Sequence, residues 1–206
     1  MEILGTLFGS PAKVKIMRLF LFNPEKTFDL SEIADRAKVT QSLAKREVSS
    51  IHKSNLIKER IFVKTTERNV KGKKVQMKRK TCGYTINETF PYLMTLKNLM
   101  LNTKSLEGSK IVERLSRTGK LKLVLVSGVF INDPESRVDM LVVGDKMSRA
   151  SINNAVKHIE SEIGKELNYA FFEMEDFKYR LGMYDKLIRD ILDYPHKVLL
   201  DRINIK

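Results

Sequence analysis

Between Asp29 and Ile57, apolar residues recur at intervals of three and four, the pattern of helices that share one buried side. These apolar positions are Leu30, Ile33, Ala34, Val39, Ala44, Val48, Ile51, Leu56 and Ile57. Asp29 and Glu32 have the spacing of a capping box, and Thr40 can cap a second helix through its side-chain oxygen. The pattern therefore predicts two helices around a small core, the second covering about residues 41–53.

A further helix is predicted from Ser10 to about Phe22, with Ser10 as its cap and Pro11 at the first helical position. The pair Asn23-Pro24 ends this helix, because proline blocks its continuation. Basic residues lie inside the apolar stretch of residues 1–22 on a helical period, which fits an amphipathic helix better than a signal peptide. We expect a three-helix core in a protein that stays in the cytoplasm.

A basic hairpin is predicted after these helices. Residues 57–64 favour a strand, and after the ten residues TTERNVKGKK the segment VQMKRKTCGYTI can pair back on it antiparallel. The basic residues around Gly72 are Lys71, Lys73, Lys74, Lys78, Arg79 and Lys80. Such a charge run taken alone is usually a solvated loop. Its position directly after the predicted helices favours contact with a partner instead.

The second helix leaves a polar and basic set of side chains outside its apolar positions. These are Gln41, Ser42, Lys45, Arg46 and Ser49, with Thr40 at the cap. Side chains of these types can contact base edges and phosphates from the major groove of DNA. We therefore predict a recognition helix at about 41–53 that reads double-stranded DNA. In the hairpin, at about 64–80, the predicted DNA-binding residues are Lys71, Lys73, Lys74 and Lys78.

Positive charge is concentrated in the same part of the chain. The 206 residues carry a formal net charge of +13, with 38 Lys and Arg against 25 Asp and Glu. Residues 1–90 contain 19 of the basic and 9 of the acidic residues, whereas residues 91–206 contain 19 and 16. This asymmetry favours a polyanion as the partner of the N-terminal part.

Residues 31–57 resemble the helix-turn-helix of bacterial and archaeal winged-helix transcription regulators, and residues 63–86 resemble their wing. The resemblance implies a DNA-binding transcription regulator whose wing lies beside the DNA backbone or in the minor groove. Many such regulators form a homodimer through a linking helix, which would place two recognition helices roughly 34 Å apart. Residues 89–104 are expected to form this helix, starting at Thr89, and either pair with a second copy or pack on the C-terminal domain.

Residues 105–206 alternate between helix and strand patterns, which predicts an α/β domain with a mixed sheet. The predicted elements are a helix at 107–117, strands at 121–127 and 138–144, a helix at 148–163, a strand at 168–173, helices within 176–192 and a strand at 198–200. The expected fold class is thus α+β, with a winged helix-turn-helix domain (1–88), the linking helix (89–104) and the α/β domain (105–206).

Residues 121–145 resemble the core of the minimal nucleotidyltransferases, relatives of DNA polymerase β. In that family a Gly-Ser turn approaches the triphosphate, and two acids alternating on the next strand hold divalent ions. Here the turn is Ser127-Gly128, and Arg137 stands where the first acid is expected, so only Asp139 is kept. A guanidinium in place of a metal ligand argues against two-metal chemistry. The domain is therefore expected to be inactive, and the protein not an enzyme.

Ser127, Gly128, Arg137 and Asp139 are nevertheless a possible binding site for a nucleotide-like ligand, with assembly or docking of a protein partner as the alternative role of this domain. Two other functions stay open: an active metal-dependent nucleotidyltransferase that grips its substrate with the winged helix, and a winged helix that binds protein instead of DNA. No apolar run approaches the ~18 residues that span a bilayer. One Cys and three His offer no zinc spacing. We expect no membrane, metal or cofactor.

Overall fold

The structure is a computed structural model that describes residues 3–70, 73–102, 108–131, 133 and 135–205, without the side chains of 66–70, 73–75 and 101–102. The chain divides into two compact units. The first comprises Met1–Ser105 and Ser161–Lys165, and the second comprises Leu106–Glu160 and Glu166–Lys206. The fold is of the α+β class, as predicted, with a two-stranded sheet in the first unit and a four-stranded mixed sheet in the second.

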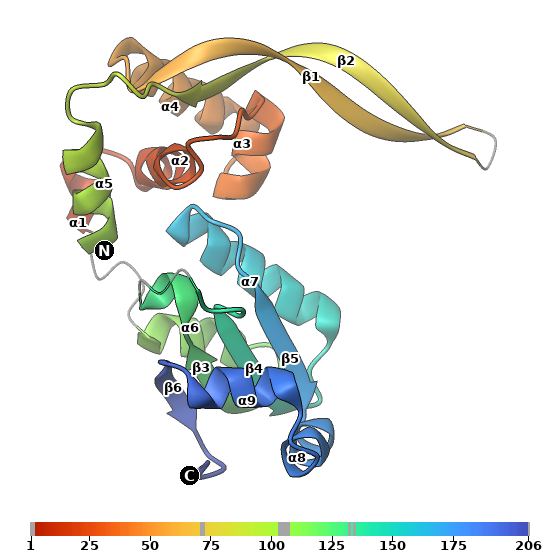
Figure 1. The fold of residues 1–206 in the computed structure, drawn as a ribbon. Coiled ribbons are helices and arrows are strands. Elements are labelled where there is room, and N and C mark those ends of the chain that lie inside the picture. The colour runs from red at the N-terminus through yellow and green to blue at the C-terminus, as the bar shows by residue number, and fades with distance from the viewer. Residues whose placement is uncertain (1–2, 71–72, 103–107, 132, 134, 206) are drawn as a thin grey trace. The chain divides into compact units, whose positions relative to one another are not determined.

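The first unit consists of short helices followed by a long hairpin and one more helix (Figure 1). Its elements are α1 (Ile3–Leu7), α2 (Pro11–Leu21), α3 (Leu30–Ala37), α4 (Gln41–Lys53), β1 (Ile57–Val70), β2 (Lys73–Ile86) and α5 (Leu93–Asn102). Helices α2, α3 and α4 pack around one apolar core, whose buried members include Ile16, Phe20 and Ile33. Ile57 and Ile86 belong to the same core, so the base of the hairpin is fixed on the helices.

Side-chain caps start the three core helices at the predicted residues. The Ser10 hydroxyl accepts a hydrogen bond from the amide three residues on, at 3.3 Å. At α3, Asp29 accepts from the Glu32 amide at 2.9 Å while Glu32 accepts from the Asp29 amide at 3.0 Å, which completes the capping box. Thr40 accepts from the amide three residues on at 3.4 Å. The predicted caps are confirmed, and each one satisfies amides that the helix leaves unpaired.

The hairpin is longer than the sequence pattern predicted. Strand pairing runs from Ile57 opposite Ile86 to Val70 opposite Lys73, with 14 residues on each strand. At roughly 3.3 Å per residue the hairpin is about 45 Å long, and Figure 1 shows it extending well past α3. The first strand was predicted to end at Lys64, but β1 continues to Val70 and β2 begins at Lys73, because two threonines and a valine in that polar run are β-branched and favour a strand.

Helix α5 begins at Leu93, later than the predicted start at Thr89. The Thr89 hydroxyl donates to the Asn87 side chain at 2.9 Å and so belongs to a turn before the helix instead of capping it. On the inner side of α5, Met100 is buried, and Leu93 and Leu96 pack against the core of α2, α3 and α4. Helix α5 is thus part of the core of the first unit.

The chain from residue 108 onward forms helices around a four-stranded sheet. Its elements are α6 (Gly108–Ser116), β3 (Lys120–Val126), the short 3-10 helix η1 (Gly128–Phe130), β4 (Met140–Asp145), α7 (Arg149–Ile163), β5 (Tyr169–Glu173), α8 (Met174–Gly182), α9 (Lys186–Asp193) and β6 (Lys197–Asp201). The strand order is β5-β4-β3-β6, and only the β4–β5 pair among these described strands is parallel. The predicted mixed sheet is confirmed.

The sheet of the second unit has apolar side chains on both faces. Leu123, Leu125, Leu141 and Val143 share one buried cluster with side chains of α8 and α9. The alternate residues on the same strands, such as Val124 on β3 and Val142 on β4, are buried as well and point to the opposite face. Both faces of the sheet are therefore covered, and the sheet lies at the centre of the core of the second unit.

Candidate nucleic-acid interface

The outer side of α4 carries the side chains predicted to contact DNA. Gln41, Lys45 and Ser49 follow one another at four-residue intervals, with Ser42 and Arg46 in the adjacent row, and all five are exposed. We call these five residues the α4 strip. The opposite side of the helix is buried in the core through Ala44, Val48 and Ile51. The helix is therefore fixed by its inner side, which leaves the α4 strip open to a partner.

Within the α4 strip, Arg46 is tied to its neighbour Glu47. Arg46 Nη2 and Nε donate to Glu47 Oε1 at 3.0 and 3.3 Å, and Lys13 Nζ of α2 lies 3.8 Å from the other carboxylate oxygen. Glu47 is buried, so these two cations balance a charge that would otherwise be costly there and would repel phosphates. The sequence prediction overlooked Glu47. Lys45 is consequently the better candidate for direct contact with DNA.

Thr40 positions the start of α4. Its hydroxyl oxygen accepts from the Leu43 amide at 3.4 Å and lies 3.2 Å from the Ser42 hydroxyl. The side chain is exposed, but its hydrogen-bonding capacity is partly used inside the chain. Thr40 therefore fixes the start of α4 and, with it, the orientation of the α4 strip.

Lys64, on β1, joins the hairpin to the start of α3. Its Nζ pairs with Asp29 and, at 3.0 Å, with Glu32, the two members of the capping box. Burial by itself raises the pKa of Asp29, but hydrogen bonds from Lys64 and the Glu32 amide outweigh burial and lower it. Burial likewise lowers the pKa of Lys64, and its bonds to Asp29 and Glu32 raise it overall. These three charged groups form what we call the Lys64 clamp.

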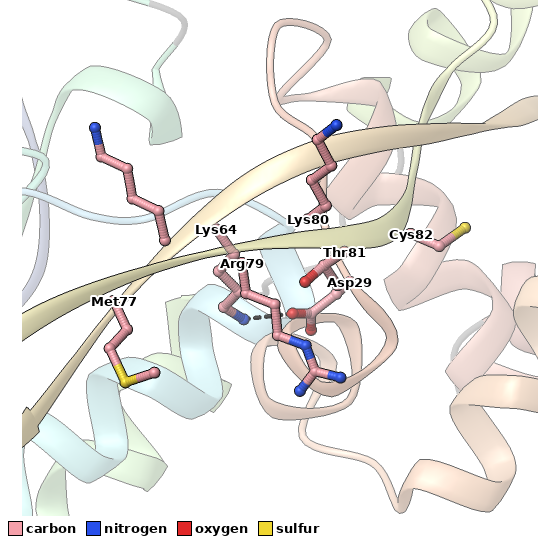
Figure 2. Close-up of a pocket in the computed structure, with 8 residues that line it drawn as sticks. Asp29, Lys64, Met77, Arg79, Lys80, Thr81 and Cys82 are labelled. Carbon is pink, nitrogen blue, oxygen red and sulfur yellow. Dashed lines mark hydrogen bonds and ion pairs between the residues drawn. The ribbon is translucent and has the colours of Figure 1, made fainter.

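Beside the Lys64 clamp lies a hollow of about 760 Å³, lined by Asp29, Lys64 and residues 77–82 (Figure 2). Lys64 and Arg79 are directly opposite each other in the strand register, so they share one face of the hairpin. The neighbouring Lys78 and Lys80 alternate to the other face. Lys64 is engaged by Asp29 and Glu32, so the cations offered to a polyanion here are Arg79 on one face and Lys78 and Lys80 on the other.

The hairpin lysines predicted to contact DNA lie toward its far end. Lys78 is exposed on β2, Lys73 and Lys74 are at the start of the same strand, and Lys71 lies outside the described residues. Their positions on one strand follow from the extended pairing described above. Lys78 is therefore the member of this set whose exposure supports a role in binding.

Two exposed cations near the base of the hairpin escaped the sequence prediction. Lys58 and Arg60 follow Ile57 on β1, and both are exposed. They are two positions apart and therefore lie on the same face of the strand. Alternation of charge along β1 could have identified them, but the prediction relied on the charge run around Gly72.

In the second unit, three of the predicted ligand residues meet around a buried carboxylate. Asp139 accepts from the Val129 amide at 2.9 Å through Oδ1 and from the Asn168 amide at 2.8 Å through Oδ2. The Ser127 hydroxyl donates to the Val138 carbonyl, and the Ser127 amide donates to the Asp139 carbonyl at 2.9 Å. A Cβ on Gly128 would lie 2.2 Å from Asp139 Oδ1. Asp139 therefore joins three chain segments and serves their geometry.

Arg137 is held apart from this group. Its Nη1 lies 2.8 Å from Asp190 Oδ2 on α9, and its side chain is otherwise mostly exposed. Strand β4 begins only at Met140, so the predicted strand start at Val138 is wrong and residues 137–139 precede the strand. The acid and the arginine therefore do not alternate along one strand as the nucleotidyltransferase resemblance implies.

No family model matches the chain, and neither a curated protein nor a solved structure does. Across the described part of the chain, no group of three or more His, Cys, Asp or Glu is placed to hold a metal ion. Within the same residues, no helix combines the length and the apolar character that crossing a membrane requires. Inference about function therefore rests on the α4 strip, the hairpin and the second unit themselves.

Proposed function

We propose that the protein is a winged-helix transcription regulator that binds duplex DNA, with α4 in the major groove and the β1–β2 hairpin as a wing along the backbone. The α4 strip is the observation that carries the proposal, because it presents amide, hydroxyl and ammonium groups on one exposed side of a firmly packed helix. The cations of the hairpin support it, since phosphates are their natural partners. The Lys64 clamp holds this wing beside α3.

In this proposal the second unit does not transfer nucleotides. Both oxygens of Asp139 already accept backbone amides, and Arg137 pairs with Asp190, which supports a structural role for this turn. Incubation with magnesium and labelled nucleoside triphosphates should give no transfer to DNA or protein. Transfer that Asp139→Asn abolishes would establish the unit as an enzyme instead.

The regulator is proposed to act as a homodimer. Large apolar side chains are exposed on α1 and around the start of α5, namely Ile3, Leu7, Tyr92 and Met94. Exposed apolar side chains of this size are common at contacts between subunits. Sedimentation of the full chain should give twice the monomer mass, and Leu7→Glu with Met94→Glu should return the monomer.

Selection of bound sequences from a random pool of duplexes tests DNA binding and symmetry together. Enrichment of one sequence, arranged as a two-fold palindrome, is the expected result. A mobility shift with the enriched duplex then gives the affinity. Failure to enrich any duplex, combined with capture of a protein partner by the first unit, would favour the protein-binding alternative.

Lys45→Ala is the sharpest variant for the α4 strip. We expect about a tenfold or greater loss of affinity for the selected duplex, because a base or phosphate contact is removed. Lys178→Ala is the matched control, since Lys178 is an exposed lysine on α8 in the other unit. Equal affinities of these two variants would remove α4 from the interface. Arg46→Ala is harder to interpret, because it also removes a cation that pairs with the buried Glu47 carboxylate.

Salt dependence tests the role of the hairpin. If about 6 to 10 phosphates are contacted, affinity should fall by about 10³ to 10⁵ between 50 and 200 mM salt. Lys78→Ala should weaken binding to all duplexes equally. It should also reduce the slope of log affinity against log salt concentration by about one. A salt dependence unchanged by Lys78→Ala would place that lysine outside the interface.

A further inference from the structure

Within the described residues, the guanidinium group of Arg46 uses one of its two donor edges. Nε and Nη2 donate to Glu47 Oε1 at 3.3 and 3.0 Å, which occupies the edge that these two nitrogens form. A guanidinium carries five N–H donors in one plane, so a second edge is formed by Nη1 and the outer N–H of Nη2. This second edge has no partner among the described residues. Arg46 therefore has two parallel donors to offer to a ligand.

Glu47 fixes the direction in which Arg46 points. The Glu47 side chain is 5% exposed, and its second carboxylate oxygen lies 3.8 Å from Lys13 Nζ on α2. A buried carboxylate held between two cations stays with them, because separation would leave an uncompensated charge in the core. The Arg46 side chain, by contrast, is 73% exposed. One edge of an exposed guanidinium is thus bound to a buried group, and the other edge points away from it.

The neighbours of Arg46 on the outer side of α4 are small. Ser42 lies one turn before Arg46, and Ser49 and Ser50 lie one turn after it, all of them exposed. Their short hydroxyl side chains leave room around the guanidinium group. Arg46 is also in the second turn of the helix, close to the end that approaches base edges when such a helix enters the major groove. A base pair beside α4 can therefore reach the second edge of Arg46.

We propose that Arg46 reads a guanine in the major groove and that Glu47 is the positioning residue for this contact. The inference rests on the proposed function and adds a base preference to it. Guanine presents two neighbouring acceptors in the major groove, N7 and O6, which match the two donors of Arg46. Adenine offers one acceptor beside a donor, thymine one acceptor beside a methyl group, and cytosine a donor. Because Glu47 already restricts the rotamers of Arg46, less side-chain entropy is lost when DNA binds.

Selection of duplexes from a random pool tests this preference when the unmodified chain, Arg46→Lys and Glu47→Gln are compared. We expect one guanine in each enriched half-site, preferred over other bases by about 5- to 150-fold, the range for one bidentate contact. Arg46→Lys should lose most of this preference, because an ammonium group lacks the planar pair of donors. Glu47→Gln should lower it by about fivefold, because the bond that holds Arg46 loses its charge. Affinity for duplexes without this guanine should not fall in Glu47→Gln, since the removed charge repels phosphates.

Base analogues in the enriched duplex locate the contact. Deazaguanine, in which carbon replaces N7, should weaken binding by about fivefold or more, since one acceptor is lost. Hypoxanthine keeps both N7 and O6 and should bind as well as guanine does. Lys45→Ala is the matched control, because this neighbouring cation takes no part in the bonds to Glu47. It should lower the affinity and keep the guanine preference.

Three results would overturn the inference. The first is an unchanged base preference in Arg46→Lys, and the second is an equal loss of affinity on every duplex, which would assign Arg46 to a phosphate. The third is a full guanine preference in Glu47→Gln, which would remove the positioning role. All three leave DNA binding in place, whereas failure to enrich any duplex removes the proposed function and this inference together. Far-UV circular dichroism checks folding, and Glu47→Met replaces Glu47→Gln if that variant does not fold.

Discussion

Asp29 and Asp139 are both buried carboxylates that connect distant parts of the chain, but their partners differ. Asp29 pairs with the ammonium group of Lys64, 35 residues away, and caps α3. Asp139 accepts two backbone amides, from Val129 and Asn168. A side-chain cation can be removed by mutation or by pH, whereas backbone amides remain and are left unpaired if the carboxylate is lost. The second arrangement should therefore be the more sensitive to substitution.

The largest effect is expected for Asp139→Ala. The amides of Val129 and Asn168 would both lose a charged acceptor, which should lower the free energy of unfolding by about 3 kcal/mol. Thermal unfolding of the full chain and hydrogen exchange of the β4 and β5 amides measure the loss. Glu135→Ala, an exposed acid in the same loop, is the control and should change little. A loss below about 1 kcal/mol would mean that the two amides find other partners.

Gly128→Ala should come next in the size of its effect. Gly128 has a φ of +54°, and an added Cβ would collide with Asp139 Oδ1 at 2.2 Å. Strain of this kind costs about 1 to 3 kcal/mol, and it should displace the Asp139 carboxylate. Gly182→Ala is the control, because nothing lies within 4 Å of a Cβ there. If the two alanine variants unfold at the same temperature, the turn is not held by Asp139.

Asp29→Asn and Asp29→Ala separate the two roles of that residue. Asparagine keeps the helix cap and loses the ion pair with Lys64, so we expect a loss of about 0.5 to 1 kcal/mol. Alanine loses the cap too, and the loss should rise to about 1 to 2 kcal/mol. Urea unfolding of the first unit gives both values. Identical values for the two variants would show that the cap contributes nothing. Asp35→Asn, which removes an exposed ion pair with Lys38 on the same helix, is the control for loss of charge alone.

The pH dependence of the Lys64 clamp is expected to be the smallest of these effects. The pKa of Asp29 is lowered from 3.8, so its contribution to stability is present above that pH and is lost as the pH falls through the folded value. The pKa of Lys64 is raised from 10.5, so its contribution is present below that pH and is lost as the pH rises through the folded value. The difference in unfolding free energy between the unmodified protein and Lys64→Met should therefore be constant between these limits and shrink outside them. A change near pH 7 would implicate another group.

Local features of the fold could be predicted from the sequence. The caps at Ser10, Asp29 and Thr40 depend on residues three positions apart, and the helices they start were predicted correctly. The length of the hairpin was not predicted. Residues such as Thr65 and Thr66 are polar, which is typical of loops, but their β-branched side chains favour a strand.

The partners of the candidate site residues could not be predicted, because they depend on tertiary packing. Nothing in the sequence spacing links Lys64 to Asp29, or Asp139 to Asn168. Glu47 is adjacent to Arg46 in sequence and could have been considered, but its burial follows from the packing of α2 against α4.

The Lys64 clamp has a consequence for the order in which the first unit folds. Asp29 takes part in one interaction three residues away and another 35 residues away. The first can form as soon as α3 does, whereas the second requires closure of a long loop and the presence of β1. The start of α3 should therefore become protected from hydrogen exchange in two kinetic steps, and the later step reports arrival of the hairpin.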